Sequence, residues 1–186
     1  ILGALSNVSA TIAATITTSN GVGTIQNDDF PILVELNGDN NLIITDQLPG
    51  GADFTTIFKR SGTDLVISDA NVKVETHIGT QVSDNEVRIA FADFTGQRII
   101  IDAGDGDDLI TVDFSGNDPI PANGILFNGQ GQTNGDALAL SGGTVTTVTH
   151  TFTNANGTVD IDGSLVAYTG LEPIADNLIA TNRIFT

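Results

Sequence analysis

The residues best suited to chemistry gather at positions 102–111, where aspartates alternate with small residues. This stretch reads Asp-Ala-Gly-Asp-Gly-Asp-Asp-Leu-Ile-Thr, so carboxylates crowd a tight turn that leads directly into an apolar, strand-like segment. Hard divalent cations such as Ca²⁺ take several oxygen ligands, and glycine lets backbone carbonyls approach beside carboxylates without side-chain clashes. The pattern predicts a structural Ca²⁺ site with the candidate ligands Asp102, Gly104, Asp105, Gly106, Asp107 and Asp108.

Other acidic positions extend this set of candidate ligands. Asp39 and Asp136 each lie in a turn rich in Gly and Asn that comes before an apolar run, and Asp28 and Asp29 form an acidic pair further towards the amino terminus. An ordinary turn, in which Asp side chains bond to nearby backbone groups and stay solvated, explains the same residue types without a metal. The sequence leaves both interpretations open.

Paired carboxylates also suit acid–base chemistry on polysaccharides, which is the alternative function. Parallel β-helices host polysaccharide lyases and glycosidases, and Asp102, Asp105 and Asp107 are the candidates for acid and base. The six Lys and Arg residues are scattered, however, and His77 and His150 lie near neither a serine-nucleophile motif nor a zinc-type spacing. We therefore expect no enzyme, and we expect each histidine to be an ordinary strand residue.

Composition narrows the classes of partner. The 186 residues include 23 Asp and Glu against 6 Lys and Arg, for a formal net charge of −17. This charge repels phosphate backbones and anionic head groups, and no apolar run approaches the ~20 residues of a spanning helix, so neither nucleic acid nor membrane insertion is expected. Bound cations would relieve the self-repulsion of the folded chain.

Two residue types that are missing from the sequence also bear on the prediction. The chain has no Cys, which excludes disulfides and thiolate metal sites, so burial, backbone pairing and ions must stabilise the fold. It has no Met, and we expect it to be a piece of a longer protein.

Short segments rich in Ile, Val, Leu, Thr and Phe alternate with Gly, Asn, Asp and Ser along most of the chain. This is typical of β-strands joined by turns, and it predicts an all-β protein of 186 residues with a core of its own. The only expected helical turn is at residues 171–178, where Pro173 would lie near its first position.

A unit of glycine, aspartate and an apolar strand recurs at irregular spacing, in residues 37–45, 61–68, 106–111 and 128–140. Recurring turn-plus-strand units indicate stacked coils that bury their apolar sides against each other, so we expect a parallel β-helix or β-solenoid body. The alternating segment Val72–Glu75 would suit a half-solvated sheet, and an antiparallel β-sandwich is the alternative.

Residues 103–111 resemble the nonapeptide of the repeats-in-toxin family, whose stacked turns bind Ca²⁺ within a parallel β-roll. Gly104, Gly106, Asp108 and Ile110 match the pattern, whereas Ala103 replaces its first glycine. No regular tandem copies follow. The resemblance implies a hemolysin-type Ca²⁺-binding turn, and it covers only a small part of the chain.

The amino-terminal residues 21–29 resemble the closing signature of Calx-β domains, which are Ca²⁺-binding β-sandwich modules strung in tandem. The resemblance implies that residues 5–12 belong to the penultimate strand region, that residues 23–25 form the last strand, and that Asp28 and Asp29 share an interdomain ion. Residues 126–129 and 168–174 resemble phrases of the spacer modules that follow such domains in large secreted bacterial surface proteins. We therefore expect a Calx-β remnant at 1–30, a solenoid-like module at 31–175, and a linker or the start of a next module at 176–186.

An isolated piece of a β-sandwich presents unpaired strand edges, so residues 1–25 need a partner. We expect them to pair with the main body or to add a strand to a neighbouring copy. The function expected from the sequence is a non-catalytic structural or adhesive module, stabilised by Ca²⁺, of a large extracellular or cell-surface protein. Its expected partners are other modules or copies of the same protein, and extracellular matrix or polysaccharide.

Overall fold

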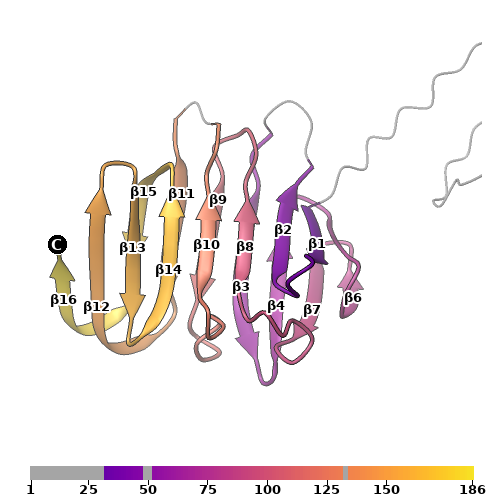
Figure 1. Ribbon diagram of the computed structural model, residues 1–186, viewed down its shortest axis with the longest axis horizontal. Helices are drawn as coiled ribbons and strands as arrows, with labels where there is room; N and C mark the ends of the chain where they lie inside the picture. Colours follow the sequence, from indigo (N-terminus) through magenta and orange to yellow (C-terminus); the bar gives the residue numbers. More distant parts are fainter. Residues whose placement is uncertain (1–31, 48–51, 132–133) are drawn as a thin grey trace, which may run out of the picture.

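The computed structural model describes residues 32–47, 52–131 and 134–186, and every regular element in them is a β-strand (Figure 1). The strands form two mixed sheets, one of nine strands and one of seven, which lie face to face and do not close into a barrel. The prediction of an all-β protein is therefore confirmed. The described residues include no helix with the length and hydropathy needed to cross a bilayer.

The nine-stranded sheet, called sheet A here, runs in the order β16 (Ile179–Phe185), β12 (Thr144–Thr153), β13 (Asn156–Ile161), β14 (Ser164–Thr169), β10 (Ile125–Asn128), β8 (Ile99–Asp102), β2 (Leu42–Asp46), β1 (Ile32–Leu36) and β5 (Val74–Thr76). Sheet B runs in the order β15 (Leu171–Asp176), β11 (Asp136–Ser141), β9 (Leu109–Asp113), β3 (Thr55–Ser61), β4 (Asp64–Asp69), β7 (Glu86–Ala90) and β6 (Thr80–Ser83).

Four strands of sheet A lie parallel and side by side, and each is followed directly along the chain by a strand of sheet B. In sheet A, β2, β8, β10 and β14 are neighbours, and in sheet B their successors β3, β9, β11 and β15 are neighbours in the same order. The register is continuous, since Ile100 pairs with Ile43 on one side and with Leu126 on the other. All four connections from sheet A to sheet B therefore cross at the same end of the molecule, which we call the crossover end.

Antiparallel strands extend both sheets beyond the block of four parallel strands. β4 and β7 extend sheet B from β3, and β13 lies between β12 and β14 in sheet A. Two of the four recurring sequence units, at 37–45 and 61–68, form the antiparallel hairpins β1–β2 and β3–β4. The other two lead into β9 and β11, which are parallel neighbours. A Gly-Asp turn before an apolar strand thus serves both kinds of connection.

The core lies between the sheets and follows the two-residue alternation of the strands. Ile44, Ile101 and Phe127 come from successive parallel strands of sheet A, and all are fully buried. Phe58 and Val112 occupy equivalent positions in sheet B. Burying each such side chain stabilises the fold by about 1.5–3 kcal/mol, so the alternation accounts for how the two layers are held together.

The helical turn expected at residues 171–178 is wrong, because β15 occupies Leu171–Asp176 and pairs with β11. Proline is tolerated there because β15 is an edge strand, where a missing N–H breaks no second ladder. Residues 179–185, within the segment expected to be a linker or the start of a next module, form β16 and pair with β12 in parallel. The Calx-β-like segment and the acidic pair Asp28–Asp29 lie outside the described residues.

Candidate functional site

The predicted acidic turn lies at the crossover end, in the connection between β8 and β9. Parallel pairing stacks this connection against its neighbours, because Leu109 pairs with Thr55 on one side and with Ala137 on the other. The residues one position before Thr55, Leu109 and Ala137 therefore fall in a row, which consists of Phe54, Asp108 and Asp136. The structure thus brings Asp136, predicted separately, next to Asp108.

Two buried carboxylates in this row share a hydrogen-bond pattern. Asp108 accepts a bond from the backbone N–H of Phe54 on Oδ1, at 2.9 Å, and its own N–H donates to Asp136 Oδ1 at 2.8 Å. Asp108 is 1% exposed and Asp136 is 0% exposed. Asp108 Oδ2 is also buried and has no hydrogen-bond partner among the described residues. A charged carboxylate at position 108 is therefore incompletely compensated.

The pKa values of Asp108 and Asp136 are both raised, so their surroundings disfavour the charged form. Burial raises the pKa of Asp108 from 3.8 to about 7, the Phe54 N–H acts in the opposite direction, and the negative charges of Asp136, Asp46 and Asp53 add to the rise. Burial also raises the pKa of Asp136, with contributions from Asp107 and Asp53. Several carboxylates therefore lie close enough at this end of the molecule to shift each other's pKa values.

Asp107, the residue beside this row, points to different partners. Its N–H donates to Asp53 Oδ1 at 2.8 Å, and its Oδ1 accepts the N–H of Asn134 at 2.7 Å. Asp102, at the end of β8, accepts a bond from the side-chain amide of Asn128 at 2.8 Å. Asp105 is exposed and forms an isolated bridge to Gly131. The three candidates for acid–base chemistry are thus spread along one connection.

The two glycines of the turn are required by its geometry. Gly104 has φ 82°, and a Cβ there would lie 3.2 Å from a carboxylate oxygen of Asp46. Gly106 has φ 149°, and a Cβ would lie 3.2 Å from Asp108 Oδ1 and 3.4 Å from Asp53 Oδ1. Both backbones occupy conformations that side chains rarely adopt, so the glycines let the carboxylates pack against the chain.

Asp39 lies apart from the other candidate ligands. It is exposed in the turn between β1 and β2, at the end of the molecule opposite the crossovers. Sequence reasoning missed Asp46 and Asp53, which lie close enough to Asp108 to raise its pKa. The available signal was that Asp53 stands before β3 as Asp107 stands before β9, but only the parallel register reveals this equivalence.

The crossover end offers oxygen ligands for a cation, but the described side chains alone do not form a complete coordination shell. Within the described residues, no three side chains of Asp, Glu or His converge closely enough to hold a metal ion. Ca²⁺ also accepts backbone carbonyls and water, and the buried Asp108 Oδ2 is an oxygen without a hydrogen-bond donor. The donor chemistry therefore fits a hard cation bound partly by carbonyls and water.

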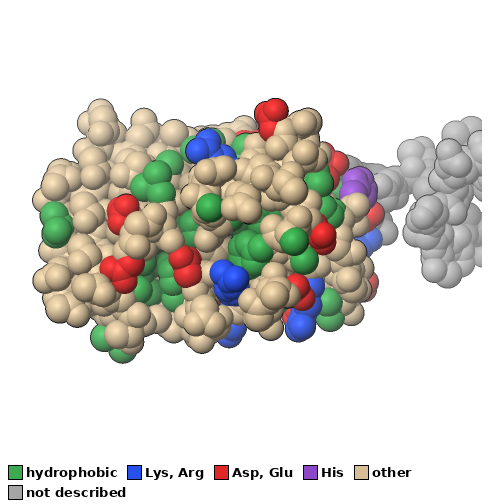
Figure 2. All heavy atoms as spheres, turned by 60° about the horizontal axis from the view of Figure 1, so that its bottom comes forward, with side chains coloured by type: hydrophobic (Ala, Val, Ile, Leu, Met, Phe, Trp, Pro, Cys, Tyr) green, Lys and Arg blue, Asp and Glu red, His purple; other side chains and the backbone are tan. Residues whose placement is uncertain are grey.

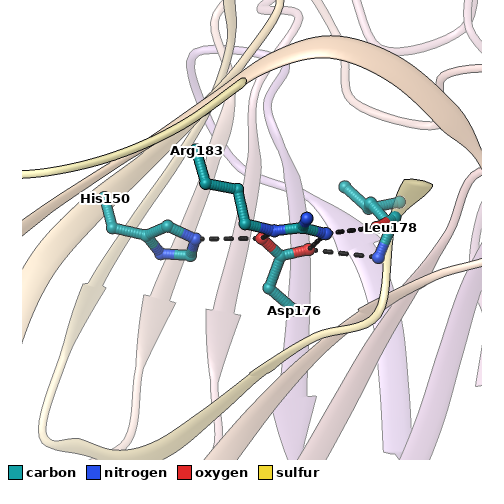
Figure 3. Close-up of polar contacts among 4 residues, drawn as sticks. All are labelled: His150, Asp176, Leu178 and Arg183. Carbon is teal, nitrogen blue, oxygen red and sulfur yellow. Dashed lines mark hydrogen bonds and ion pairs between the residues drawn. The ribbon is translucent and has the colours of Figure 1, made fainter. Parts of the chain in front are cut away.

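A half-buried carboxylate, Asp176 on β15, is compensated by Arg183 and by hydrogen bonds (Figure 3). Its Oδ2 lies 2.9 Å from Arg183 Nε and 3.2 Å from His150 Nε2, and its Oδ1 accepts the N–H of Leu178 at 3.1 Å. Burial acts to raise the pKa of Asp176, but the hydrogen bonds of Arg183, His150 and Leu178 outweigh it and lower the pKa. Sequence reasoning missed this cluster, because its members come from three strands.

Charged side chains are dispersed on one face of the molecule. Figure 2 shows acidic and basic side chains scattered over one face of the molecule, with apolar side chains between them. The basic side chains form no patch on this face.

No family model matches the chain, and neither a curated protein nor a solved structure matches it. The function is therefore argued from geometry.

Proposed function

We propose that this chain is a non-catalytic structural or adhesive module of a large extracellular or cell-surface protein, stabilised by Ca²⁺ at its crossover end. The observation that carries the proposal is the stacked pair Asp108 and Asp136, both buried, with Asp108 Oδ2 lacking a hydrogen-bond donor among the described residues. Removing an uncompensated carboxylate from water is costly, and a bound cation offsets that cost.

The body of the module is proposed to be a β-solenoid with inserted hairpins. Its support is that parallel strands recur in both sheets in the same order, joined by crossovers at one end. An antiparallel sandwich would be expected to lack these parallel ladders. Nuclear Overhauser contacts linking Ile43, Ile100 and Leu126 in parallel register are the expected result, and antiparallel contacts among them would contradict the proposal.

The proposed location follows from how weak Ca²⁺ sites work. Extracellular modules bind Ca²⁺ with dissociation constants of about 10⁻⁴–10⁻³ M, because that suffices at the concentrations outside cells. A site that relies on carbonyls and water beside one buried carboxylate oxygen belongs in this range. The proposed partners are other modules or copies of the same protein, with matrix or polysaccharide as the adhesive alternative.

The test is thermal unfolding of the full chain in Ca²⁺, in Mg²⁺ and in chelator. Ca²⁺ at 100 times its dissociation constant stabilises a native-only site by about 2.7 kcal/mol, so a clear rise in melting temperature is expected. Asp108→Asn keeps the acceptor for the Phe54 N–H and should lose most of that rise. Asp39→Asn, at an exposed position far from the crossovers, is the matched control and should keep it. Equal melting temperatures of the parent chain in Ca²⁺ and in chelator would contradict the proposal.

A further inference from the structure

The two sheets have four edge strands, and these differ in how well they are protected from pairing. β5 has three residues and lies beside the ion pair of Lys73 and Glu75, and β6 has four residues. β15 carries Pro173. Short length, charge and proline all prevent another strand from adding to an edge. β16 has seven residues, so it is not short, and it contains no proline. Its only charged residue is Arg183, so charge protects this edge weakly.

The side chains of β16 are unusually apolar for a sheet edge. Ile179 is 70% exposed, Ile184 is 46% exposed and Phe185 is 64% exposed. Phe185 pairs with the buried His150, which places it on the inner face of sheet A, and Ile184 points to the outer face. Arg183 is held by Asp176 and by the carbonyl of Leu178 (Figure 3), so its charge is already engaged.

The inner face of sheet A beside β16 is incompletely packed. A cavity of about 290 Å³ lies between β15 and the ends of β12 and β16, with apolar walls that include Phe152, Leu171, Ile174 and Phe185. His150 and Tyr168 also line it. Both are buried, and among the described residues neither His150 Nδ1 nor the Tyr168 hydroxyl has a hydrogen-bond partner. An added chain would cover the apolar walls and bring polar backbone groups to this place.

We propose that β16 is the acceptor edge for strand addition by residues 8–17 of a second copy of this chain. The proposal rests on the structural role proposed above and names the partner. Residues 8–17 read Val-Ser-Ala-Thr-Ile-Ala-Ala-Thr-Ile-Thr, a composition that favours strands. Every charged residue of the chain lies at position 28 or later, so this segment approaches the acidic body of another copy without repulsion.

The distance to be spanned favours a second copy over the chain's own edge. In sheet A, six strands separate β1, which begins at Ile32, from β16, and at the usual strand spacing this is about 34 Å. A flexible chain of the same length as residues 18–31 would span about 20 Å on average. Pairing between copies has no such limit, and because donor and acceptor differ it leads to an open chain of subunits.

The absence of cysteine makes a direct test clean. Ile184→Cys is mixed with single-cysteine variants at each of positions 8–17, the mixture is oxidised, and disulfides between different chains are identified by mass spectrometry. Cross-links at alternating donor positions are expected, because side chains on a strand alternate faces. A monomeric parent chain at all concentrations, uniform or absent cross-links, or cross-linking only within one chain carrying both cysteines would each overturn the proposal.

A pair of lysine variants tests the edge itself. Ile184→Lys places a charge on the edge strand and should abolish assembly in sizing by light scattering, whereas Ile57→Lys places one on the interior strand β3, where Ile57 is 38% exposed, and should leave assembly unchanged. Equal behaviour of the two variants would overturn the proposal. The Ca²⁺-dependent melting of Ile184→Lys separates the two ideas, because the proposed metal role predicts that its Ca²⁺ response survives when assembly is lost.

Discussion

Asp108 is buried and Asp176 is half-buried, at opposite places in the fold, and their surroundings shift their pKa values in opposite directions. Asp108 is surrounded by other aspartates and has its pKa raised to about 7, whereas Asp176 contacts Arg183 and His150 and has its pKa lowered. Both accept backbone N–H bonds. The comparison teaches that the sign of the nearby charges decides whether a buried carboxylate stabilises this fold in its ionised form.

Asp69 provides a third case, in which backbone groups do the compensating. It is 2% exposed, its Oδ2 accepts the Thr55 N–H at 2.6 Å, and its Oδ1 accepts the N–H groups of Asn71 and Val72 at 2.8 and 2.9 Å. Both of its oxygens are therefore satisfied without a cation. In contrast, the buried Asp108 Oδ2 in the crossover row has no hydrogen-bond donor among the described residues.

The largest expected effect is a pH dependence of the metal-free chain. The pKa of Asp108 is about 7 in the folded state and 3.8 as its ordinary value, so the unfolded chain binds fewer protons between these values. In chelator, the free energy of unfolding should therefore fall as pH rises from about 4 to above 7, by on the order of 4 kcal/mol from this group. Urea unfolding across this range measures it. A flat profile, or the same loss in Asp108→Asn, would contradict the assignment.

A smaller effect is expected when the backbone-compensated carboxylate is changed. Asp69→Asn replaces one accepting oxygen by an N–H₂ group that faces a backbone N–H, so stability should fall by about 2 kcal/mol. Asp108→Asn in chelator at pH 8 should have the opposite sign, because it removes an uncompensated charge. Midpoints of urea unfolding compare the two variants. A loss of similar size for both would break the distinction between them.

The smallest effect is expected from Arg183→Gln, because Arg183 is partly exposed and water screens its charge. The lowered pKa of Asp176 contributes stability that is present above about pH 4 and is lost as pH falls through the folded value. The variant should melt slightly lower at pH 7 and show a weaker loss on acidification. Lys73→Gln, which disrupts an exposed pair, is the control and should change neither.

The strands and the acidic turn could be predicted because their signals are local. Alternation of apolar residues marks strands such as Leu109–Asp113, and glycines beside aspartates mark the turn before it. Residues 171–178 were misjudged because Pro173 suits the start of a helix as well as an edge strand, and only the position of β15 in the sheet decides.

The composition of the two charged clusters could not be predicted, because long-range pairing assembles them. Asp53 and Asp107 are brought together by the register of β3 with β9, and Asp176 meets His150 across two sheets. Neither contact can be read from the sequence alone, because the equivalent positions of Asp53 and Asp107 before their strands are revealed only by the parallel register. His150 was expected to be an ordinary strand residue; it does lie on β12, but it also contacts Asp176 and lines a cavity.

The order of the parallel layers also bears on how the chain reaches its native state. The ladder of β2 with β8 pairs Ile43 with Ile100, and the ladder of β10 with β14 pairs Leu126 with Ala167. Each ladder therefore requires the closure of a long loop. The hairpin of β3 and β4 connects residues much closer in the chain and needs no such closure. Closing a long loop costs conformational entropy before the contacts that it allows have formed, and folding is slow for this reason. The inserted hairpins thus offer early local structure, on which the distant layers can later assemble from one end of the molecule to the other.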